Sequence, residues 1–250
     1  MSDRIDRILQ ASAVDESWRD LLTAALRELP PEYLDFLLYG SYLPGIERLL
    51  APFSTMRYAE CRYILFGQDP YPRKESAAGY AFIDGRVDRI FSPKGGLTSE
   101  VNRATSLRNF IKMLLVVRGG LECSDLSASA VAAADKRGMI STMRELRLNF
   151  EKAGVLLLNA AAVFEDSSRT RYHTAIWRAF TDRLLSGMND ISPRLILLGR
   201  HAAAIADLPG AGALQSLKAE HPYNISFICN ESMHALFSPM RLLERDDIHI

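Results

Sequence analysis

Four short apolar runs, each bounded by turn residues, are spaced along the chain after residue 60. They are Tyr63–Phe66, Val155–Leu158, Leu195–Leu198 and the weaker Leu214–Ala219. Runs of this length without strict alternation are typical of strands that are covered on both faces of a parallel sheet. The pattern therefore predicts four strands in one sheet.

Helical patterns lie before and between these runs. Helical spacing of apolar residues predicts a helix within residues 14–28, and a second is expected over 31–39, after Pro30-Pro31. Three further apolar stripes predict helices between the strands: Leu107, Phe110, Ile111, Leu114 and Leu115; Ile140, Met143, Leu146 and Phe150; and Ile176, Phe180, Leu184 and Leu185.

Strands that alternate with helices indicate a parallel sheet with right-handed crossovers. We predict an α/β fold with a central four-stranded, mostly parallel, twisted sheet and helices on both faces. Residues 1–250 are expected to form a single domain, with a helical N-terminal extension over 1–40. The stretch 117–139 is rich in Gly, Ala, Ser and Asp, and predicts a variable loop with one short helix.

Composition limits the function classes. The chain has 250 residues, 48% of them hydrophobic, which is enough for one large core or two small ones. Thirty basic and 30 acidic residues give zero net charge, which argues against a strong global attraction to DNA or membranes but leaves room for a local basic patch. The N-terminus lacks the apolar region of a signal peptide, and no apolar run reaches bilayer length, so a membrane partner is not expected.

The three cysteines, Cys61, Cys123 and Cys229, are far apart and match no metal-ligand spacing. We therefore expect no metal or other cofactor, and reduced thiols as in a cytoplasmic protein.

Polar groups follow each of the four predicted strands. Asp69 follows the first run, Asn159 ends the second, Gly199 and Arg200 with His201 follow the third, and His221 follows the fourth. In an open parallel sheet, ligands bind beyond the carboxyl ends of the strands, so these groups are expected to converge. Each also has a simpler interpretation: Asn159 and Asp69 as helix caps, and His221 as an ordinary loop histidine.

The chemistry of these groups favours recognition of a nucleobase. Pro70 and Pro72 restrain Asp69 and Tyr71, because each proline fixes its own φ and limits the preceding residue. The chain has neither a G-x-S-x-G elbow nor a glycine-rich phosphate loop. A carboxylate, an amide that can read a planar edge and the aromatic ring of Phe82 suit a base that has left the stack.

Five motifs, in order, resemble those of the first, uracil-selective family of uracil-DNA glycosylases. They are GQDPY at 67–71, GYAF at 79–82, GVLLLN at 154–159, LLGRHA at 197–202 and HPYNIS at 221–226. The resemblance covers roughly residues 41–245. It implies a DNA repair enzyme that flips uracil out of DNA and hydrolyses its N-glycosidic bond, leaving an abasic site and free uracil.

The resemblance also implies roles for particular residues. Asp69 would activate water and stabilise positive charge on the sugar, and His221 would donate a hydrogen bond to the uracil oxygen that gains charge. Asn159 would read the polar edge of uracil, while Tyr71 would exclude a thymine methyl group. Further roles are a backbone contact from Gln68, stacking by Phe82, a wedge at Ile225, and DNA contacts from Ser106, Gly199, Arg200, Pro222 and Ser226.

Some loops depart from the family pattern. Pro72-Arg73 replaces the usual His-Gly, and HPYNIS replaces the usual His-Pro-Ser-Pro loop, so phosphate contacts and the preference for single- or double-stranded DNA stay open. Candidate basic contacts are Arg73, Arg103, Arg169 and Arg200, each equally compatible with a solvated surface role.

Two alternatives stay open: a non-catalytic relative that binds DNA or a replication protein, and a glycosylase with changed base selectivity. With no lysine at a strand tip, strand cleavage is not expected. The expected partners are uracil-containing DNA and a proteinaceous uracil-glycosylase inhibitor, for a monomer that is cytoplasmic, or nuclear in a eukaryotic or viral setting.

Overall fold

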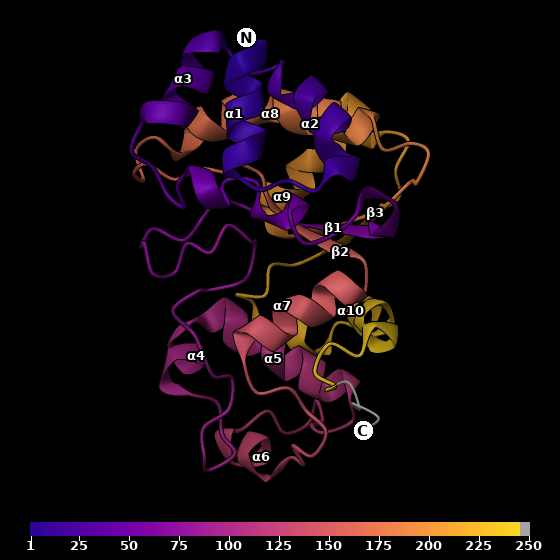
Figure 1. Ribbon diagram of the computed structural model, residues 1–250. Helices are drawn as coiled ribbons and strands as arrows, with labels where there is room; N and C mark the ends of the chain where they lie inside the picture. Colours follow the sequence, from indigo (N-terminus) through magenta and orange to yellow (C-terminus); the bar gives the residue numbers. More distant parts are fainter. Residues whose placement is uncertain (246–250) are drawn as a thin grey trace, which may run out of the picture. The chain divides into compact units, whose positions relative to one another are not determined.

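The computed structural model describes residues 1–245 and divides into two compact units. The first unit comprises Met1–Asp84 and Gly154–Lys218, and the second comprises Gly85–Ala153 together with the chain from Ala219 onward (Figure 1). Residues 246–250, the end of the predicted 1–250 domain, lie outside the described residues. The single-domain organisation stays a prediction.

The sheet has the strand order β2-β1-β3-β4. Its strands are β1 (Tyr63–Gly67), β2 (Val155–Asn159), β3 (Arg194–Leu198) and β4 (Ser216–Ala219). Strand β1 pairs in parallel with both β2 and β3, so that Tyr63 lies opposite Val155 and Arg194. The predicted α/β class and four-stranded parallel sheet are confirmed.

One detail of the strand prediction is wrong. Strands β1 to β3 are buried along most of their length, as expected, but β4 exposes Ser216 and Lys218. Strand β4 is the last strand in the sheet order, and such an edge strand can turn polar side chains to solvent.

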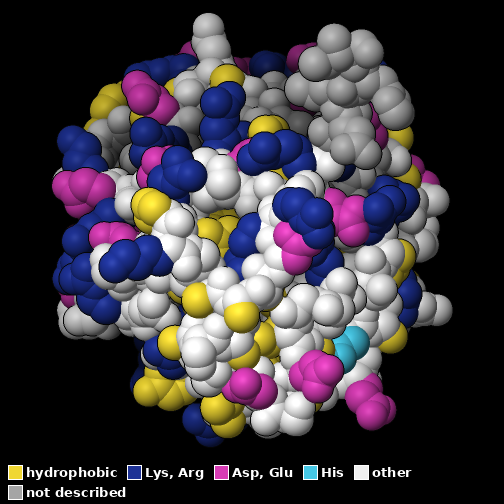
Figure 2. All heavy atoms as spheres, turned by 90° about the horizontal axis from the view of Figure 1, so that it is seen from below, with side chains coloured by type: hydrophobic (Ala, Val, Ile, Leu, Met, Phe, Trp, Pro, Cys, Tyr) yellow, Lys and Arg dark blue, Asp and Glu magenta, His cyan; other side chains and the backbone are white. Residues whose placement is uncertain are grey.

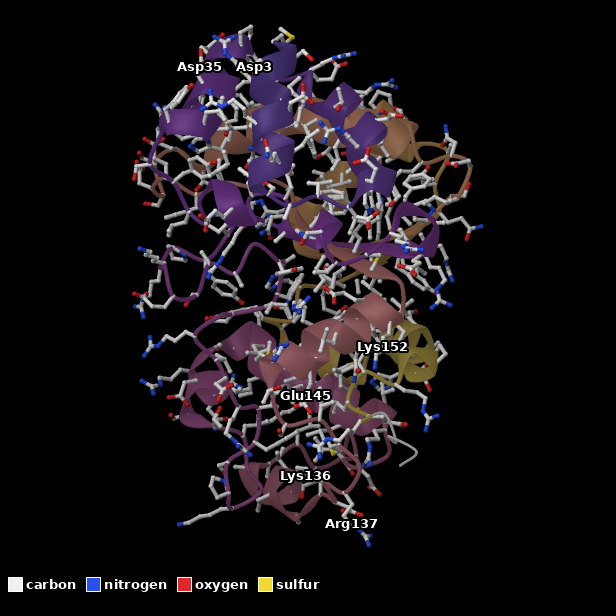
Figure 3. The ribbon with its side chains drawn as sticks, viewed as in Figure 1. Asp3, Asp35, Lys136, Arg137, Glu145 and Lys152 are labelled. Atoms are coloured by element: carbon white, nitrogen blue, oxygen red, sulfur yellow. A yellow bond between two sulfur atoms is a disulfide. The ribbon has the colours of Figure 1, made fainter. Side chains whose placement is uncertain are left out.

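Five helices accompany the sheet in the first unit: α1 (Ser2–Ala11), α2 (Arg19–Leu26), α3 (Pro31–Tyr39), α8 (Thr170–Ser186) and α9 (Gly199–Ala203). The core of this unit joins buried side chains from α2, α8, β1 and β3, among them Leu22, Trp177, Ile64 and Leu195. Helix α3 begins at Pro31 because proline is already set for the first helical position, as the sequence predicts. An ion pair of 2.6 Å joins Arg4 on α1 to Asp35 on α3. Asp35 is labelled in Figure 3.

Short 3-10 turns complete the first unit: η1 (Glu16–Trp18), η2 (Ile46–Arg48), η3 (Ala51–Phe53), η4 (Tyr58–Glu60), η5 (Ala204–Asp207) and η6 (Pro209–Ala211).

The second unit is helical. It contains α4 (Ser99–Arg103), α5 (Thr105–Val117), α6 (Ala128–Ala133), α7 (Met143–Lys152), η7 (Ile225–Cys229), α10 (Glu231–Phe237) and η8 (Ser238–Met240). Phe110 on α5 is the centre of its packing, with ring centroids 5.9 Å from Phe150, 6.0 Å from Phe227 and 5.3 Å from Phe237. These contacts join α5 to α7, η7 and α10.

A disulfide joins Cys123 to Cys229 in the second unit, with 5.9 Å between the Cα atoms. The expectation of reduced thiols is therefore wrong for this pair, and correct for the buried Cys61. The two cysteines are 106 residues apart, so their spacing gave no sign of the bond. The segment 117–139 contains the one short helix that was predicted, α6, and Lys112 Nζ donates to the Leu126 carbonyl at 2.6 Å.

Within residues 1–245, no helix has the length and apolar character needed to cross a membrane. On the face in Figure 2, Lys and Arg side chains are interspersed with Asp and Glu. This mixture agrees with the zero net charge of the chain.

Candidate functional site

The tips of β1 and β2 lie side by side, and they place Asn159 against Gly67. These two residues are register partners on neighbouring parallel strands. A Cβ atom at Gly67 would lie 2.5 Å from Asn159 Oδ1, so only glycine leaves room for the amide in this position. Asn159 does not cap a following helix, because the next helix, α8, begins at Thr170. The helix-capping interpretation is therefore wrong.

Backbone bonds extend this contact beyond the strands. The Ala160 N–H donates to the Gly67 carbonyl at 2.9 Å, and the Ala161 N–H donates to the Gln68 carbonyl at 3.0 Å. The Gln68 carbonyl is thus already bonded to the chain that follows β2. The two strand tips are held in one register up to the residue that precedes Asp69.

Asp69 is half-buried and accepts a hydrogen bond from Thr170 Oγ1 to its Oδ2 at 3.3 Å. Burial raises the pKa of Asp69 above its ordinary value, while Thr170 and the nearby His201 oppose this by favouring the charged form. The neighbours of Asp69 thus partly offset the cost of keeping a carboxylate in a poorly solvated place.

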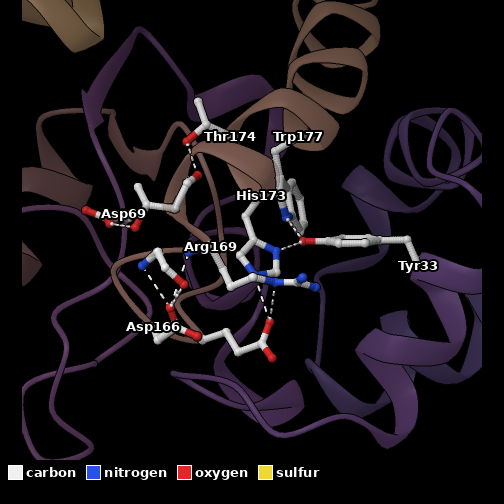
Figure 4. A network of polar contacts seen from close by, with 10 residues as sticks. Tyr33, Asp69, Asp166, Arg169, His173, Thr174 and Trp177 are labelled. Carbon is white, nitrogen blue, oxygen red and sulfur yellow. Dashed lines mark hydrogen bonds and ion pairs between the residues drawn. The ribbon is translucent and has the colours of Figure 1, made fainter.

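The first turn of α8, which carries Thr170, is fixed by a buried polar network (Figure 4). His173 Nδ1 lies 2.7 Å from Tyr33 Oη, and Trp177 Nε1 donates to the same oxygen at 3.1 Å. His173 Nε2 lies 3.3 Å from Glu165 Oε2. Burial lowers the pKa of His173, so the neutral form is favoured. The network ties α8 to α3 and holds the helix end that supports Asp69.

Tyr71 and Phe82 belong to the same unit. Tyr71 is half-buried, and burial followed by the charge of Asp84 raises its pKa to about 12, so its hydroxyl stays protonated. Phe82 is also half-buried rather than part of the core, and has a φ of +62°, a left-handed conformation that is uncommon outside glycine. Its neighbour Ala81 donates to the Leu157 carbonyl at 3.3 Å. The backbone next to Phe82 is therefore hydrogen-bonded to β2.

The tip of β3 leads directly into α9. Gly199 has a φ of +84°, which suits glycine at this sharp turn, and Arg200 is exposed. Arg73 is exposed as well, and neither arginine forms an ion pair with any residue in the described part of the chain. Arg169 is instead paired with Glu165 and lies over the ring of Tyr172 at 4.6 Å.

The fourth tip residue, His221, belongs to the second unit. The Tyr223 N–H donates to His221 Nδ1 at 3.1 Å. Nδ1 therefore acts as an acceptor, and in the neutral ring the proton lies on Nε2. His221 is half-buried and lies in the loop between β4 and η7, so its role as a site residue stays a prediction.

The loop that follows His221 is anchored by a buried asparagine on α5. Asn109 is 4% exposed, and its Nδ2 donates to the carbonyls of Pro222 at 2.8 Å and Tyr223 at 3.3 Å. The tip of this loop is exposed, with Ile225 72% accessible. Ser226 is exposed too, and its hydroxyl together with Asn230 helps to lower the pKa of Glu220.

Ser106 lies in the first turn of α5 and is half-buried. Arg103, in α4, pairs with Glu100 at 3.7 Å and donates to Ser99. No cluster of His, Cys, Asp or Glu suited to a metal ion occurs within residues 1–245.

Sequence reasoning missed three supports of the site: Gly67, Thr170 and Asn109. A signal existed for two of them. Asn109 is a polar residue within an apolar stripe on α5, and Thr170 is a hydroxyl residue at the start of α8. Their partners are 113 and 101 residues away, and nothing in the sequence identifies them.

Comparison with known proteins adds independent findings. No protein-family profile matches the chain. The chain is similar to the UNG of Nitratifractor salsuginis, with 53% identity, 98% of both chains covered and a TM-score of 0.94 to its crystal structure. It is 23% identical to a uracil-DNA glycosylase of Fusobacterium nucleatum over 86% of this chain and 84% of that protein. A variant of mimivirus UNG, solved in complex with UGI, shares the fold, with 16% identity, a TM-score of 0.56, and 86% and 72% of the two chains covered.

Proposed function

Because this chain belongs to the uracil-DNA glycosylase family, we propose that it removes uracil from DNA by hydrolysing the N-glycosidic bond, with the residues described above as its catalytic and recognition groups. The product is an abasic site and free uracil. The main support for this assignment of residues is the position of the Asn159 amide. It lies against Gly67, two residues before Asp69, at the ends of two neighbouring strands. The chain that holds it is 53% identical to the UNG of Nitratifractor salsuginis.

Asp69 acts on the sugar. Cleavage of an N-glycosidic bond leaves an oxocarbenium-like sugar and an anionic base, and fixed opposite charges stabilise both. The Asp69 carboxylate stabilises the positive sugar and orients the attacking water. Thr170 supports this role, because its hydrogen bond favours the charged carboxylate in a site where burial raises the pKa of Asp69.

Asn159, Tyr71 and Phe82 select the base. The Asn159 amide reads the polar edge of uracil; cytosine would face it with a donor in place of an acceptor, leaving buried groups unpaired. Attractive contacts discriminate poorly against a single extra methyl group, so Tyr71 excludes thymine by occupying the space of that group. Support for a rigid block comes from Pro70 and Pro72, which restrain the backbone on both sides of Tyr71. Phe82 stacks on the flipped base, which repays part of the cost of unstacking.

His221 stabilises the departing base. Its Nδ1 accepts from the Tyr223 N–H, so in the neutral ring the proton lies on Nε2, the nitrogen that would donate to the base. A hydrogen bond from a neutral histidine to a uracil oxygen stabilises the negative charge that develops on that oxygen. We propose that His221 acts on the same uracil as Asp69 and Asn159.

The remaining contacts hold the DNA. We propose that Ile225 enters the duplex as an apolar wedge, which its 72% exposure allows. Ser106, Gly199 and Ser226 contact the phosphate backbone through hydroxyls and a backbone N–H, and Arg200 adds a local positive charge. Pro222, whose carbonyl accepts from Asn109, contacts the DNA through its ring. Such contacts do not require a strongly basic protein.

Release of free uracil from a single-uracil oligonucleotide, single- and double-stranded, tests the proposal. The wild-type chain is expected to release uracil from U·G and U·A duplexes and to leave thymine and cytosine in place. Asp69→Asn and His221→Gln are expected to lower turnover at least 100-fold, as loss of a transition-state contact commonly does. Thr174→Val, in the first turns of α8, is a folded control with full turnover.

The outcomes separate the competing functions. DNA binding without uracil release from the wild-type chain would establish a non-catalytic relative, and release of thymine would establish changed selectivity. Full turnover in both Asp69→Asn and His221→Gln would refute the proposed mechanism.

We further propose that the chain acts on DNA as a monomer in the cytoplasm, where a repair enzyme meets its substrate, and that a proteinaceous inhibitor of the UGI type can occupy its DNA-binding surface. Light scattering coupled to size exclusion tests the first point. Inhibition of uracil release by UGI at a 1:1 ratio tests the second.

A further inference from the structure

The loop after His221 carries a second exposed apolar side chain that the proposed wedge does not explain. Tyr223 is 67% exposed and Ile225 is 72% exposed. They are two of the most exposed large hydrophobic residues among those the structure describes, and they lie two positions apart on one short loop.

Hydrogen bonds within the protein fix the backbone of this loop. The Tyr223 N–H donates to His221 Nδ1, and its carbonyl accepts from the buried Asn109. The Asn224 N–H donates to the His221 carbonyl at 2.9 Å, and the Phe227 N–H donates to the Asn224 carbonyl at 3.2 Å. Both polar backbone groups of Tyr223 are therefore occupied within the protein, and only its ring faces outward.

The base of the loop is equally fixed. Phe227 is fully buried and stacks on Phe110 with an interplanar angle of 22°. Two residues later, the disulfide from Cys229 to Cys123 ties η7 to the segment 117–139. A loop fixed in this way presents Tyr223 and Ile225 without the ordering cost that a mobile loop would incur on binding.

The spacing of the two side chains suits stacked bases. Residues two apart in an extended chain are separated by at most about 7 Å, and consecutive bases of one strand rise by about 3.4 Å. Two side chains of this loop can therefore reach neighbouring layers of one base stack. A tyrosine ring offers a large flat face with few rotatable bonds, and aromatic rings bind bases by stacking.

Charge near the loop does not oppose nucleic acid. The acidic residue nearest to Tyr223 in the sequence, Glu220, accepts from Asn230 Nδ2 at 2.8 Å. Burial raises its pKa, but hydrogen bonds from its own backbone, Ser226 and Asn230 outweigh this and lower the pKa overall. Donors within the protein therefore bond this negative charge.

We propose that Tyr223 stacks on a base beside the vacated position of a DNA duplex, so that this loop inserts two side chains, Tyr223 and Ile225, rather than one. The inference rests on the proposed function, because DNA is the partner it requires. Stacking by Tyr223 holds the opened duplex against reclosure. Single-stranded DNA has no partner strand to reclose, and depends less on the ring.

The kinetic test compares kcat/KM for uracil release from matched single- and double-stranded oligonucleotides. Tyr223→Ala is expected to lose about 5- to 150-fold on the duplex, the range that stacking on one base corresponds to, and a smaller factor on the single strand. Tyr223→Phe keeps the ring and is expected to stay within about twofold of wild type. Tyr39→Ala, which removes a 69% exposed tyrosine from α3 in the first unit, is the matched control with unchanged kinetics.

A second readout does not require turnover. A duplex with an uncleavable deoxyuridine analogue and a photoreactive 5-iodouracil at the neighbouring position is irradiated with the wild-type chain, and the crosslink is mapped by mass spectrometry. We expect the crosslink at Tyr223, and its loss in Tyr223→Ala.

A crosslink at other residues together with equal duplex kinetics for Tyr223→Ala and wild type would overturn the inference. Failure of the wild-type chain to release uracil would instead refute the proposed function, whereas the crosslink still reports on Tyr223. An equal loss on single- and double-stranded DNA would contradict the role in holding the duplex open.

Discussion

Replacing Thr170 with valine removes the hydroxyl that donates to Asp69 Oδ2 at 3.3 Å while nearly preserving the shape of the side chain. In the wild-type chain this bond favours the charged carboxylate against the burial that raises the pKa of Asp69. Its loss raises the pKa of Asp69 further, because the charged form loses a donor. In the proposed mechanism the carboxylate form is the active one, so activity is expected to be lost at a higher pH on the acid side.

The size of the effect follows from the geometry. Hydrogen bonds to charged groups contribute about 1.5–3 kcal/mol at ordinary distances. The 3.3 Å bond is longer than the usual O–H···O distance of about 2.5–3.0 Å, and Asp69 is partly solvated, so we take about 1 kcal/mol. This corresponds to about a fivefold change in the protonation equilibrium.

The assay is kcat/KM for uracil release between about pH 4 and pH 8. On the acid limb, Thr170→Val is expected to have about one fifth of the wild-type value, while the plateau near neutral pH stays within about twofold. Thr174→Val is the control, because its hydroxyl donates to the Thr170 carbonyl at 2.8 Å and is not bonded to Asp69. An equal loss at every pH, or an acid limb that does not move, would refute the electrostatic role of Thr170.

Three further predictions concern the supports of the site. Gly67→Ala places a Cβ 2.5 Å from Asn159 Oδ1, so we expect displacement of the amide and at least a 100-fold loss of kcat/KM in the uracil release assay. Asn109→Ala leaves two loop carbonyls without their donor, and is expected to lower the free energy of unfolding by about 1–3 kcal/mol in urea titration and to lower kcat. Reduction of the disulfide between Cys123 and Cys229 is expected to lower the free energy of unfolding by about 2–4 kcal/mol, measured with and without reductant.

Each of these predictions has an internal comparison. Gly96→Ala, where the nearest atom to the new Cβ is 3.8 Å away, should retain full activity. Asn149→Ala removes a buried asparagine that donates to the carbonyls of Leu242 and Glu244, so it should lower stability like Asn109→Ala but spare kcat where folded. Equal kcat losses in both asparagine variants would contradict a specific role for Asn109. In the Cys123→Ser, Cys229→Ser double variant, reductant should have no effect on stability.

The strands and main helices could be predicted because their signals are local. Strands β1 to β3 carry apolar runs between turn residues. Helix α3 begins at Pro31, because proline is favoured at the first position of a helix. Strand β4 was predicted less well, because an edge strand needs fewer apolar residues and its run is weak.

In the candidate site, too, features with a local sequence signal could be predicted and long-range contacts could not. That Asp69 and Asn159 follow neighbouring strand tips could be predicted, because the carboxyl ends of parallel strands lie at one edge of the sheet, where ligands bind. Their roles in the site stay predictions. The Thr170 bond to Asp69 joins residues 101 positions apart, and the Cys123–Cys229 bond joins residues 106 apart. Contacts of this range depend on the packing of α8 and η7, and no local pattern encodes them. The meeting of His221 with Asp69 and Asn159 stays a prediction.

The most direct measurement of the central claim is a crystal structure of the chain with a duplex that contains an uncleavable deoxyuridine analogue. We predict a flipped uracil with the Asn159 amide on its polar edge, the Phe82 ring on its face, His221 Nε2 within hydrogen-bond distance of a base oxygen, and Asp69 beneath the sugar. A bound duplex whose uracil stays stacked, or a flipped base held by other residues, would contradict the account.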